Sequence, residues 1–327
     1  MPRRVIIDTD PGVDDALALL LALLSPELQV EAITTVCGNI PVDFAIRNVF
    51  RVLSLLEKPW PPVGRGADRP IKNELKTATA VHGEDGLGNL DRYLLPDGSP
   101  RYPDPEISPA HPGAIPLLLN LLDRFPGEIS LITLGPLTNL AQAILRDPAR
   151  MQQVQEIILM GGAIGVPGNV TPVAEFNIYT DPEAAQIVFR SGLPLTLVPL
   201  DATRQVQLTR KVIQKEIQPL GTRIAQFIVD CTAHTLEFFE QVEEIPALTL
   251  HDPLAVGVAI DPSLVNLKPL FVDVEIQGEI TRGMTVADLR SIAANLKEKP
   301  NVKVARAVDG KRFLKLFREH VCPESLS

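Results

Sequence analysis

Short hydrophobic runs alternate with stretches of helical periodicity over the first two thirds of the chain. The runs are rich in Val, Ile and Leu and give way to Gly, Asn or Asp: Val5–Ile7, Val30–Val36, Ile129–Leu134, Ile157–Met160 and Leu195–Pro199. Apolar residues recur at helical spacing in the stretches between them: Val13–Leu24, Val42–Leu56, Ala114–Leu122, Leu137–Arg146 and Pro182–Ser191. This alternation is typical of parallel βα units. Because the strands are almost continuously hydrophobic, we expect an α/β fold with a mostly parallel central sheet and helices on both faces.

The last third of the chain has a less regular pattern. It predicts a long helix at Arg223–Gln241, a second at His251–Ile260 and strand-like segments such as Leu270–Ile276. Proline and charged residues cluster at Leu94–Pro112, which we interpret as a surface loop because βα units continue beyond it. Since α/β folds often exceed the usual domain length, residues 1–327 are expected to form a single domain with loop insertions.

Composition and charge narrow the class of partner. The chain is 45% hydrophobic and 22% charged, which is typical of a globular protein. Its net charge of -9 argues against a nucleic-acid-binding protein, which needs a basic face to neutralise phosphates. The apolar run Ala16–Leu24 is much shorter than the roughly 20 residues that cross a bilayer, so membrane insertion is not expected. Cys37, Cys231 and Cys322 suit neither a disulfide framework nor a zinc site, which favours the reducing cytoplasm.

Four carboxylates follow the first predicted strand. The segment reads Asp8-Thr9-Asp10-Pro11-Gly12-Val13-Asp14-Asp15, and a helix is expected to begin within it. In open α/β sheets, ligands bind at the carboxyl ends of the strands. Carboxylates this close repel one another unless one is protonated or a hard cation such as calcium or magnesium lies among them. Acidic residues such as Asp14 and Asp15 are also common at helix N-termini, where they cap the helix. Asp8 and Asp10 precede a Pro-Gly turn and do not cap a helix directly, so a metal site explains the set better.

The same segment, with Ala16 added, resembles the amino-terminal signature of the inosine-uridine-preferring nucleoside hydrolase family. Further motifs match that family in order and spacing: Cys37-Gly38-Asn39, His82-Gly83-Glu84-Asp85-Gly86-Leu87, Leu134-Gly135-Pro136-Leu137-Thr138-Asn139, Met160-Gly161-Gly162, Ala174-Glu175-Phe176-Asn177 and His251-Asp252-Pro253. The resemblance implies the Rossmann-like nucleoside hydrolase fold and hydrolysis of the bond between ribose and nucleobase. It also implies small ribonucleoside substrates and a homodimer or homotetramer.

The resemblance further implies a calcium site. Its ligands would be Asp10, Asp15, the main-chain carbonyl of Leu134 and Asp252, all of which offer oxygen atoms as calcium requires. Taken alone, Asp252 would suit an ordinary helix cap. Asp14 would be the general base that activates a calcium-bound water for attack on the sugar. The acidic cluster would also stabilise the positive charge that develops on the sugar.

Substrate contacts follow from the same likeness. Four residues match the positions that hold the ribose: Asn39, Asn169, Glu175 and Asn177. Their amides and carboxylate supply the donors and acceptors that sugar hydroxyls need, although Asn39 by itself would also suit a turn. His251, beside the expected ligand Asp252, is the first candidate to protonate or contact the leaving base. His82 is the second candidate.

Two departures from the family leave the preferred base open. Gly161–Gly168 contains no aromatic residue that would stack on a base. Phe238 and Phe239 stand where some relatives have a tyrosine, so a hydrophobic contact is retained and a hydroxyl donor is lost. In most helices such phenylalanines belong to the core. These residues do not distinguish purine from pyrimidine preference.

Two other functions compete with this hypothesis. Asp8-Thr9-Asp10 after a hydrophobic strand is superficially similar to haloacid dehalogenase-like phosphatases, although Pro11 and the Asp14-Asp15 pair fit that family poorly. A nucleoside- or ribose-binding module without turnover would keep the metal and sugar contacts. Binding alone would not need the base Asp14, which favours the enzyme.

Overall fold

A mostly parallel sheet forms the centre of the computed structural model, which describes residues 1–105, 112–242, 247–291, 295 and 298–322. In these residues the sheet has eight strands in the order β3-β2-β1-β4-β5-β6-β12-β9. Their bounds are Arg3–Thr9 for β1, Leu28–Thr35 for β2, Val63–Arg65 for β3, Ile129–Thr133 for β4, Glu156–Met160 for β5, Leu195–Val198 for β6, Val265–Leu270 for β9 and Val302–Val308 for β12. Only β9 at the edge pairs antiparallel, with β12.

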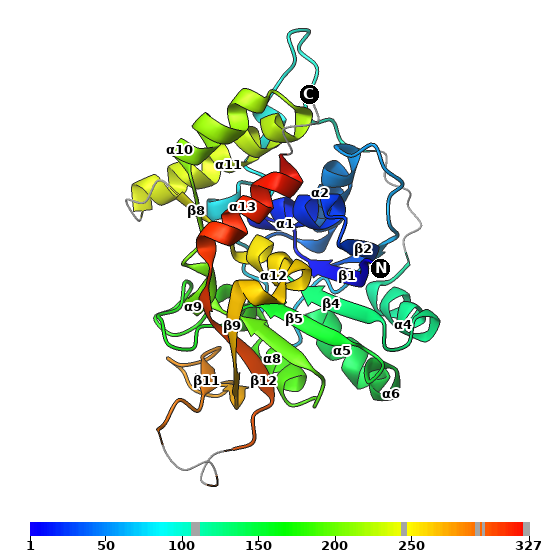
Figure 1. The fold of residues 1–327 in the computed structure, drawn as a ribbon, viewed down its shortest axis with the longest axis vertical. Helices are drawn as coiled ribbons and strands as arrows, with labels where there is room; N and C mark the ends of the chain where they lie inside the picture. Colours follow the sequence, from blue (N-terminus) through cyan, green and yellow to red (C-terminus); the bar gives the residue numbers. More distant parts are fainter. Residues whose placement is uncertain (106–111, 243–246, 292–294, 296–297, 323–327) are drawn as a thin grey trace.

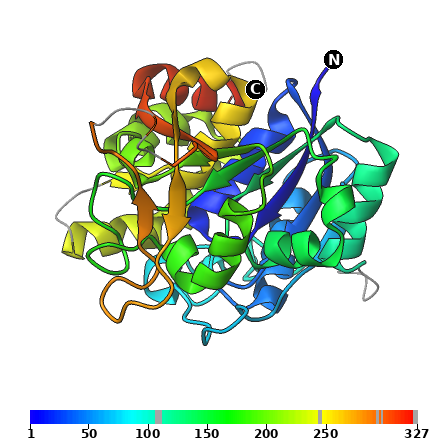
Figure 2. The ribbon, with the colours of Figure 1, turned by 90° about the horizontal axis from the view of Figure 1, so that it is seen from below.

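Helices cover both faces of the sheet (Figure 1 and Figure 2). One face carries α1 (Val13–Leu24), α2 (Val42–Ser54), α12 (His251–Ile260) and α13 (Gly310–Val321), and the other carries α4 (Ala114–Arg124), α5 (Thr138–Arg146) and α8 (Pro182–Phe189). Strand β1 shows why two layers form. Val5 and Ile7 belong to the core under α1, whereas Ile6 belongs to the core under α4 and α5. Side chains of a strand alternate between the faces, so a continuously apolar strand needs cover on both.

Shorter elements connect and extend this framework. They are α3 (Thr79–His82), α6 (Pro148–Met151), α7 (Phe176–Thr180), α9 (Leu200–Thr203), β7 (Gln207–Thr209), α10 (Arg210–Val212), the long helix α11 (Arg223–Val242), β8 (Ala247–Thr249), β10 (Val272–Val274) and β11 (Thr285–Ala287). A π-helix at Ile213–Ile217 and 3-10 turns at Leu90–Arg92, Gln218–Leu220 and Pro262–Leu264 complete the described elements. Strand β7 pairs with β8, and β10 pairs with β11, in two small antiparallel sheets.

The sequence predicted the βα units of the first two thirds correctly, with shifts of a few residues at their ends. The segment Leu270–Ile276 was wrong as one strand: β9 ends at Leu270 in the central sheet, and Val272 begins β10 in a separate hairpin. Strand β12 and helix α13 were not predicted. In the loop Leu94–Pro112, Leu95 and Ser99 are joined by a turn hydrogen bond, and residues 106–111 lie outside the described residues.

The path of the chain across the sheet reverses direction at β1. The chain passes from β1 outward through β2 and β3, and then returns to β4 on the other side of β1. Ligands of open α/β sheets bind in the crevice beyond the carboxyl ends of the strands at such a reversal. The main-chain N–H of Leu134 donates to the carbonyl of Asp8 at 2.8 Å, so the carboxyl ends of β1 and β4 lie side by side. Residues that follow these two strands therefore meet in the crevice.

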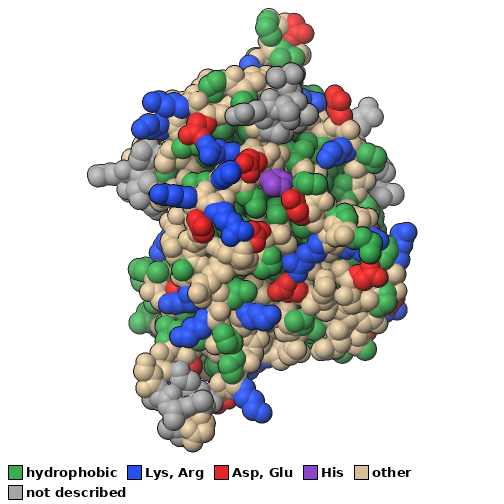
Figure 3. Space-filling view, in the orientation of Figure 1, with side chains coloured by type: hydrophobic (Ala, Val, Ile, Leu, Met, Phe, Trp, Pro, Cys, Tyr) green, Lys and Arg blue, Asp and Glu red, His purple; other side chains and the backbone are tan. Residues whose placement is uncertain are grey.

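Charged groups of both signs share the surface. On the face shown in Figure 3, Lys and Arg side chains are interspersed with Asp and Glu and with neutral groups. Among the described helices, none combines the length and the apolar character that a membrane span needs.

Candidate active site

Asp10 lies at the bottom of the crevice directly after β1 and has no exposed surface. Its Oδ2 accepts the main-chain N–H of Asn39 at 2.6 Å, whereas its Oδ1 has no hydrogen-bond partner among the described residues. Burial, followed by the charge of Asp15, raises the pKa of Asp10 well above its ordinary value. A buried carboxylate oxygen without a donor is costly in a dry protein, so this atom is available to a cation.

Two glycines allow the backbone to approach Asp10. A Cβ atom on Gly38 would lie 2.0 Å from Oδ2 of Asp10, and one on Gly135 would lie 2.3 Å from Oδ1. Real Cβ atoms do not approach oxygen this closely, so neither position accepts a side chain unless Asp10 moves. The Cys37-Gly38-Asn39 and Leu134-Gly135-Pro136 motifs thus meet around one carboxylate.

Asp15 connects the first helix to the same crevice. Its Oδ1 accepts the hydroxyl of Thr9 at 2.5 Å, and its Oδ2 accepts the main-chain N–H of Gly12 at 3.0 Å and the side-chain amide of Asn39 at 3.1 Å. The bond to Gly12 satisfies a free donor at the start of α1. Capping therefore does account for part of the role of Asp15, and the hydrogen bond from Asn39 fixes the carboxylate at the floor of the crevice.

Asp14, Asp15 and Asp252 form a buried group of carboxylates. One oxygen from each lies within 4.8 Å of the others. Burial and the charge of Asp15 raise the pKa of Asp14 to about 7, and burial and the charge of Asp14 raise the pKa of Asp252 well above its usual range. Three buried acids at this spacing repel one another, and their oxygen atoms are the ligands that a hard divalent cation prefers. The donor set therefore fits a metal ion.

The carbonyl of Leu134 is held in place by Asn177. The side-chain amide of Asn177 donates to this carbonyl at 2.6 Å and to the carbonyl of Met160 at 3.3 Å, so it links the ends of β4 and β5. Glu175 caps α7 by accepting the main-chain N–H of Asn177 at 2.9 Å, and it also accepts the N–H of Gly162 at 2.8 Å. Burial raises the pKa of Glu175. Glu175 and Asn177 are thus fixed parts of the cavity wall.

His82 is buried, His251 is partly buried, and both rings are neutral. Nδ1 of His82 accepts the main-chain N–H of Val13 at 3.1 Å, which places the proton of the neutral ring on Nε2. Nδ1 of His251 lies 2.8 Å from the hydroxyl of Thr203. Burial lowers the pKa of His82 to about 4 and that of His251 to about 3. At neutral pH each ring therefore offers an N–H hydrogen bond and carries no charge.

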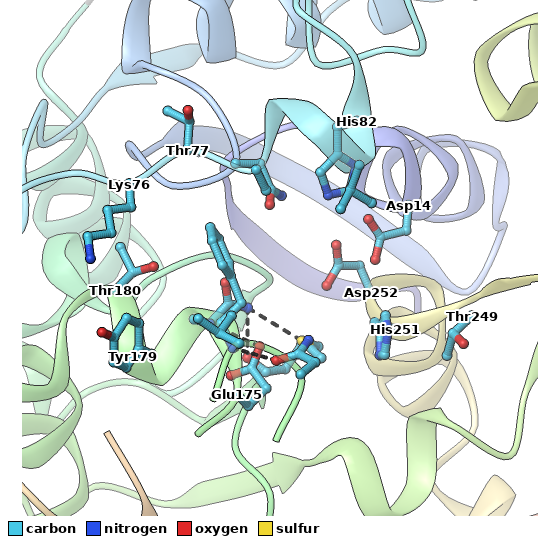
Figure 4. Close-up of a pocket in the computed structure, with 18 of the residues that line it drawn as sticks. Asp14, Lys76, Thr77, His82, Glu175, Tyr179, Thr180, Thr249, His251 and Asp252 are labelled. Atoms are coloured by element: carbon cyan, nitrogen blue, oxygen red, sulfur yellow. Dashed lines mark hydrogen bonds between the residues drawn. The ribbon is translucent and has the colours of Figure 1, made fainter. Parts of the chain in front are cut away.

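A cavity of about 860 Å³ opens above these groups. Figure 4 shows Asp14, Asp252, His82 and His251 on one side of it and Lys76, Tyr179 and Thr180 on the other. The sequence-predicted residues on its wall are Asp14, Asn39, His82, Leu134, Asn169, Glu175, Asn177, His251 and Asp252. Asp10 and Asp15 lie beneath this wall. Phe238 and Phe239 also line the cavity and pack edge to face, so these phenylalanines are not confined to the core.

Asn139 is a structural residue of the site that was not recognised from the sequence motifs alone. Its side-chain amide donates to Oδ1 of Asp8 at 2.7 Å and to the carbonyl of Thr35 at 2.9 Å, and its oxygen accepts the N–H of Ala67 at 2.8 Å. It therefore ties together the ends of β1 and β2 from the start of α5. The Leu134–Asn139 motif contained the signal, although only the carbonyl of Leu134 was given a role.

Residues 5–315 match the model of the inosine-uridine preferring nucleoside hydrolase family. The chain belongs to this family. It is accordingly a nucleoside hydrolase, an enzyme that breaks the N-glycosidic bond of nucleosides. The match excludes the alternative of a haloacid dehalogenase-like phosphatase.

Relatives of different base preference resemble this nucleoside hydrolase over almost their whole length. The pyrimidine-specific ribonucleoside hydrolase RihA of Salmonella schwarzengrund (strain CVM19633) is 39% identical over 98% of this chain and 99% of the relative. The plant nucleoside hydrolase PpNRh1 has a TM-score of 0.88 and 36% identity, with 98% of this chain and 99% of that structure covered. The purine-preferring ribonucleoside hydrolase from Gardnerella vaginalis has a TM-score of 0.87 and 33% identity, with 98% of each covered. The fold expected from the resemblance is thereby confirmed.

Proposed function

We propose that this nucleoside hydrolase cleaves ribonucleosides to free base and ribose and that it depends on calcium. The observation that carries the proposal is the group of buried carboxylates of Asp14, Asp15 and Asp252 at the floor of the cavity. Asp10, Asp15, Asp252 and the carbonyl of Leu134 would hold the ion, and the unpartnered Oδ1 of Asp10 supports its place in this set. When bound, the ion supplies positive charge that attracts the sugar diol and lowers the pKa of a water.

Asp14 is the proposed general base. It lines the cavity, whereas Asp10 and Asp15 lie below its wall, so among these three acids Asp14 is the one placed to meet a water beside the substrate. Its carboxylate accepts a proton from the water as the water oxygen bonds to the anomeric carbon of the ribose. The carbon–nitrogen bond breaks in the same reaction, and its electron pair leaves with the base. The remaining carboxylates stabilise the positive charge that develops on the sugar.

The ribose would lie against the polar wall formed by Asn39, Asn169, Glu175 and Asn177. Asn39 and Asn177 are each fixed by hydrogen bonds to the metal-site residues Asp15 and Leu134. A sugar held by these side chains keeps its anomeric carbon in one orientation relative to Asp14, and positioning of this kind lowers the barrier by several kcal/mol. The same contacts distinguish the sugar from an apolar ligand of equal size.

His251 and His82 are proposed to contact the leaving base. Because both rings are neutral, each would stabilise the departing base by donating an N–H hydrogen bond. Phe238 and Phe239 supply an apolar surface on the same cavity. We further propose a single nucleoside hydrolase domain with loop insertions that assembles as a homodimer or homotetramer. The cytoplasmic location inferred from the cysteines stays a prediction.

A direct test measures base release from a panel of purine and pyrimidine ribonucleosides. We expect turnover of at least one ribonucleoside, its loss after strong calcium chelation and its return when calcium is restored. Asp14→Ala is expected to bind the nucleoside while losing at least about a hundredfold in rate. Asp43→Ala is the matched control, because Asp43 also lies in the first turn of a helix, α2, but pairs with Arg65 on the surface.

Three results would contradict parts of this proposal. Tight nucleoside binding without base release by the wild-type protein would favour a binding module. Full activity after chelation would remove calcium from the reaction. Full activity of Asp14→Ala would show that another group is the base.

A further inference from the structure

The short helix α9 contacts two segments next to the cavity. It follows β6, and Leu200 at its start donates its main-chain N–H to the carbonyl of Gly162 at 2.9 Å. Thr203 at its end is completely buried, and its hydroxyl lies 2.8 Å from Nδ1 of His251. The helix therefore contacts both the segment that follows β5 and His251, the residue proposed to contact the leaving base.

Asp201 anchors the first half of the segment at residues 161–169. Its two carboxylate oxygens accept the main-chain N–H groups of Ile164 at 2.8 Å and Gly165 at 2.9 Å. Arg306 of β12 donates to the same carboxylate at 2.6 Å. Asp201 is buried, so this anchor is rigid and belongs to the packed framework of the sheet.

Arg204, the residue after α9, holds the second half of the segment. Its guanidinium donates to the carbonyls of Pro167 and Gly168, each at 2.9 Å. The next residue is Asn169, which lines the cavity on an exposed stretch of chain. A planar guanidinium that grips two consecutive carbonyls fixes both the position and the orientation of the backbone, which an ammonium group does less well.

We propose that Arg204 is a positioning residue that places Asn169 against the ribose. This rests on the proposed contact between Asn169 and the sugar. Asn169 is the exposed member of the four proposed ribose contacts, while the other three lie in buried surroundings. Its own side-chain oxygen is occupied by the main-chain N–H of Phe176 at 2.9 Å. The side-chain nitrogen of Asn169 remains available to donate to the sugar, and its position depends on where the backbone at Gly168 is held.

A double-mutant cycle tests the role of Arg204. Arg204→Met keeps the unbranched aliphatic part of the side chain and removes the guanidinium that donates both hydrogen bonds, and we expect kcat/KM to fall about tenfold in the enzyme that carries Asn169. In the Asn169→Ala background the same substitution is expected to change kcat/KM less than about twofold, because the positioned amide is already gone. Arg204→Lys, which keeps the positive charge and one donor nitrogen, should recover part of the loss.

Two controls separate positioning from stability. Arg190→Met removes another exposed guanidinium, which pairs with Asp273 away from the cavity, and is expected to leave kcat/KM unchanged. The melting temperature of Arg204→Met is expected to stay close to that of the wild type because the side chain is exposed. Equal loss in both Asn169 backgrounds would overturn the proposal, since Arg204 would then act independently of Asn169.

The outcome also distinguishes this inference from the proposed function. If Asn169→Ala alone leaves kcat/KM unchanged, the proposed ribose contact is wrong, and the role of Arg204 fails with it. If Asn169→Ala lowers kcat/KM while Arg204→Met does not, the ribose contact stands and only the positioning role is wrong.

Discussion

The side-chain amide of Asn177 donates a 2.6 Å hydrogen bond to the main-chain carbonyl of Leu134. The residue proposed to touch the sugar thus also orients a carbonyl proposed to bind the metal. A side-chain amide whose nitrogen donates to the protein still has its oxygen available to accept from another donor. The arrangement couples the proposed metal site to the proposed ribose contacts through one buried side chain.

Asn177→Ala is therefore expected to damage both sites. A buried carbonyl that loses its donor costs about 1 to 3 kcal/mol, so kcat/KM should fall about tenfold or more, with weaker calcium binding by calorimetry. Asn73→Ala is the control, because the Asn73 amide likewise donates to two main-chain carbonyls, of Tyr179 and Thr180, on the same cavity. Equal losses in both variants would indicate general loosening of the cavity and would contradict a special role for Asn177.

Gly135 is expected to be essential because it borders Asp10. A Cβ in Gly135→Ala would lie 2.3 Å from Oδ1 of Asp10 and would force the carboxylate away. We expect roughly ten- to hundredfold weaker calcium binding, measured by titration calorimetry. In the control Gly113→Ala the new Cβ meets its nearest neighbour, Pro116, at 3.4 Å, so affinity should not change. Wild-type calcium affinity in Gly135→Ala would mean that Asp10 is not a ligand.

The buried cysteines are expected to be inert in the native enzyme. Burial raises the pKa of Cys37 to about 12, and burial also raises the pKa of Cys231 well above its ordinary value. Since the thiolate is the reactive form and a raised pKa removes it, the thiolate fraction of Cys37 at pH 8 is roughly a thousandfold below that of an ordinary thiol. The reactivity of an accessible thiol should rise with pH, because a larger fraction of it is then deprotonated.

A chromogenic disulfide reagent measures this directly. At pH 8 we expect slow reaction in the native protein, led by the half-buried Cys322, whose pKa burial raises to about 11, and rapid reaction of all three cysteines in guanidinium. Cys322→Ser should remove the leading native phase. Rapid modification of Cys37 without unfolding would show that the crevice around Asp10 opens on its own.

The sequence was sufficient to predict those parts of the fold in which the local hydrophobic pattern matches the burial of each residue in the structure. Val5, Ile6 and Ile7 of β1 form an unbroken apolar run and α1 follows with helical spacing, so the βα units were predictable. Strand β12 was not, because the alternation of apolar and polar residues in Val302–Val308 is interrupted at Val304 and Ala305, where the pairing with β9 also becomes irregular, and because its other partner, β6, lies far away in the chain. Leu270 and Val272 belong to different sheets although one residue separates them.

The site shows the same division. The grouping of Asp10, Asp14 and Asp15 was predictable because several carboxylates in one short segment need a shared explanation. Asp8 was the exception, since it lies within β1 and accepts hydrogen bonds from Thr34 and Asn139. Thr203 and Arg204 were not predictable, because they reach His251 and the carbonyl of Gly168 through contacts that no local motif encodes. Acidic residues that act together can be recognised in the sequence because they are clustered. A residue that only positions another side chain has no such pattern around it.

Calcium is expected to stabilise the folded enzyme as well as activate it. The buried carboxylates of Asp14, Asp15 and Asp252 repel one another in the metal-free protein, and an ion bound only by the folded state shifts the unfolding equilibrium. At a concentration about 100 times its dissociation constant, calcium should add about 2.7 kcal/mol to the free energy of unfolding. Thermal or denaturant unfolding with and without chelator measures this.

Asp15→Asn separates this effect from non-specific salt stabilisation. The variant keeps an oxygen able to accept from Thr9 or Gly12 but loses one negative charge from the cluster, so calcium should stabilise it far less than the wild type. Without calcium, the variant is expected to resist unfolding at least as well as the metal-free wild type, because one repulsive charge is gone. A calcium-induced shift of equal size in both proteins would place the ion outside this cluster, and the carboxylates would then need another source of positive charge to remain buried together.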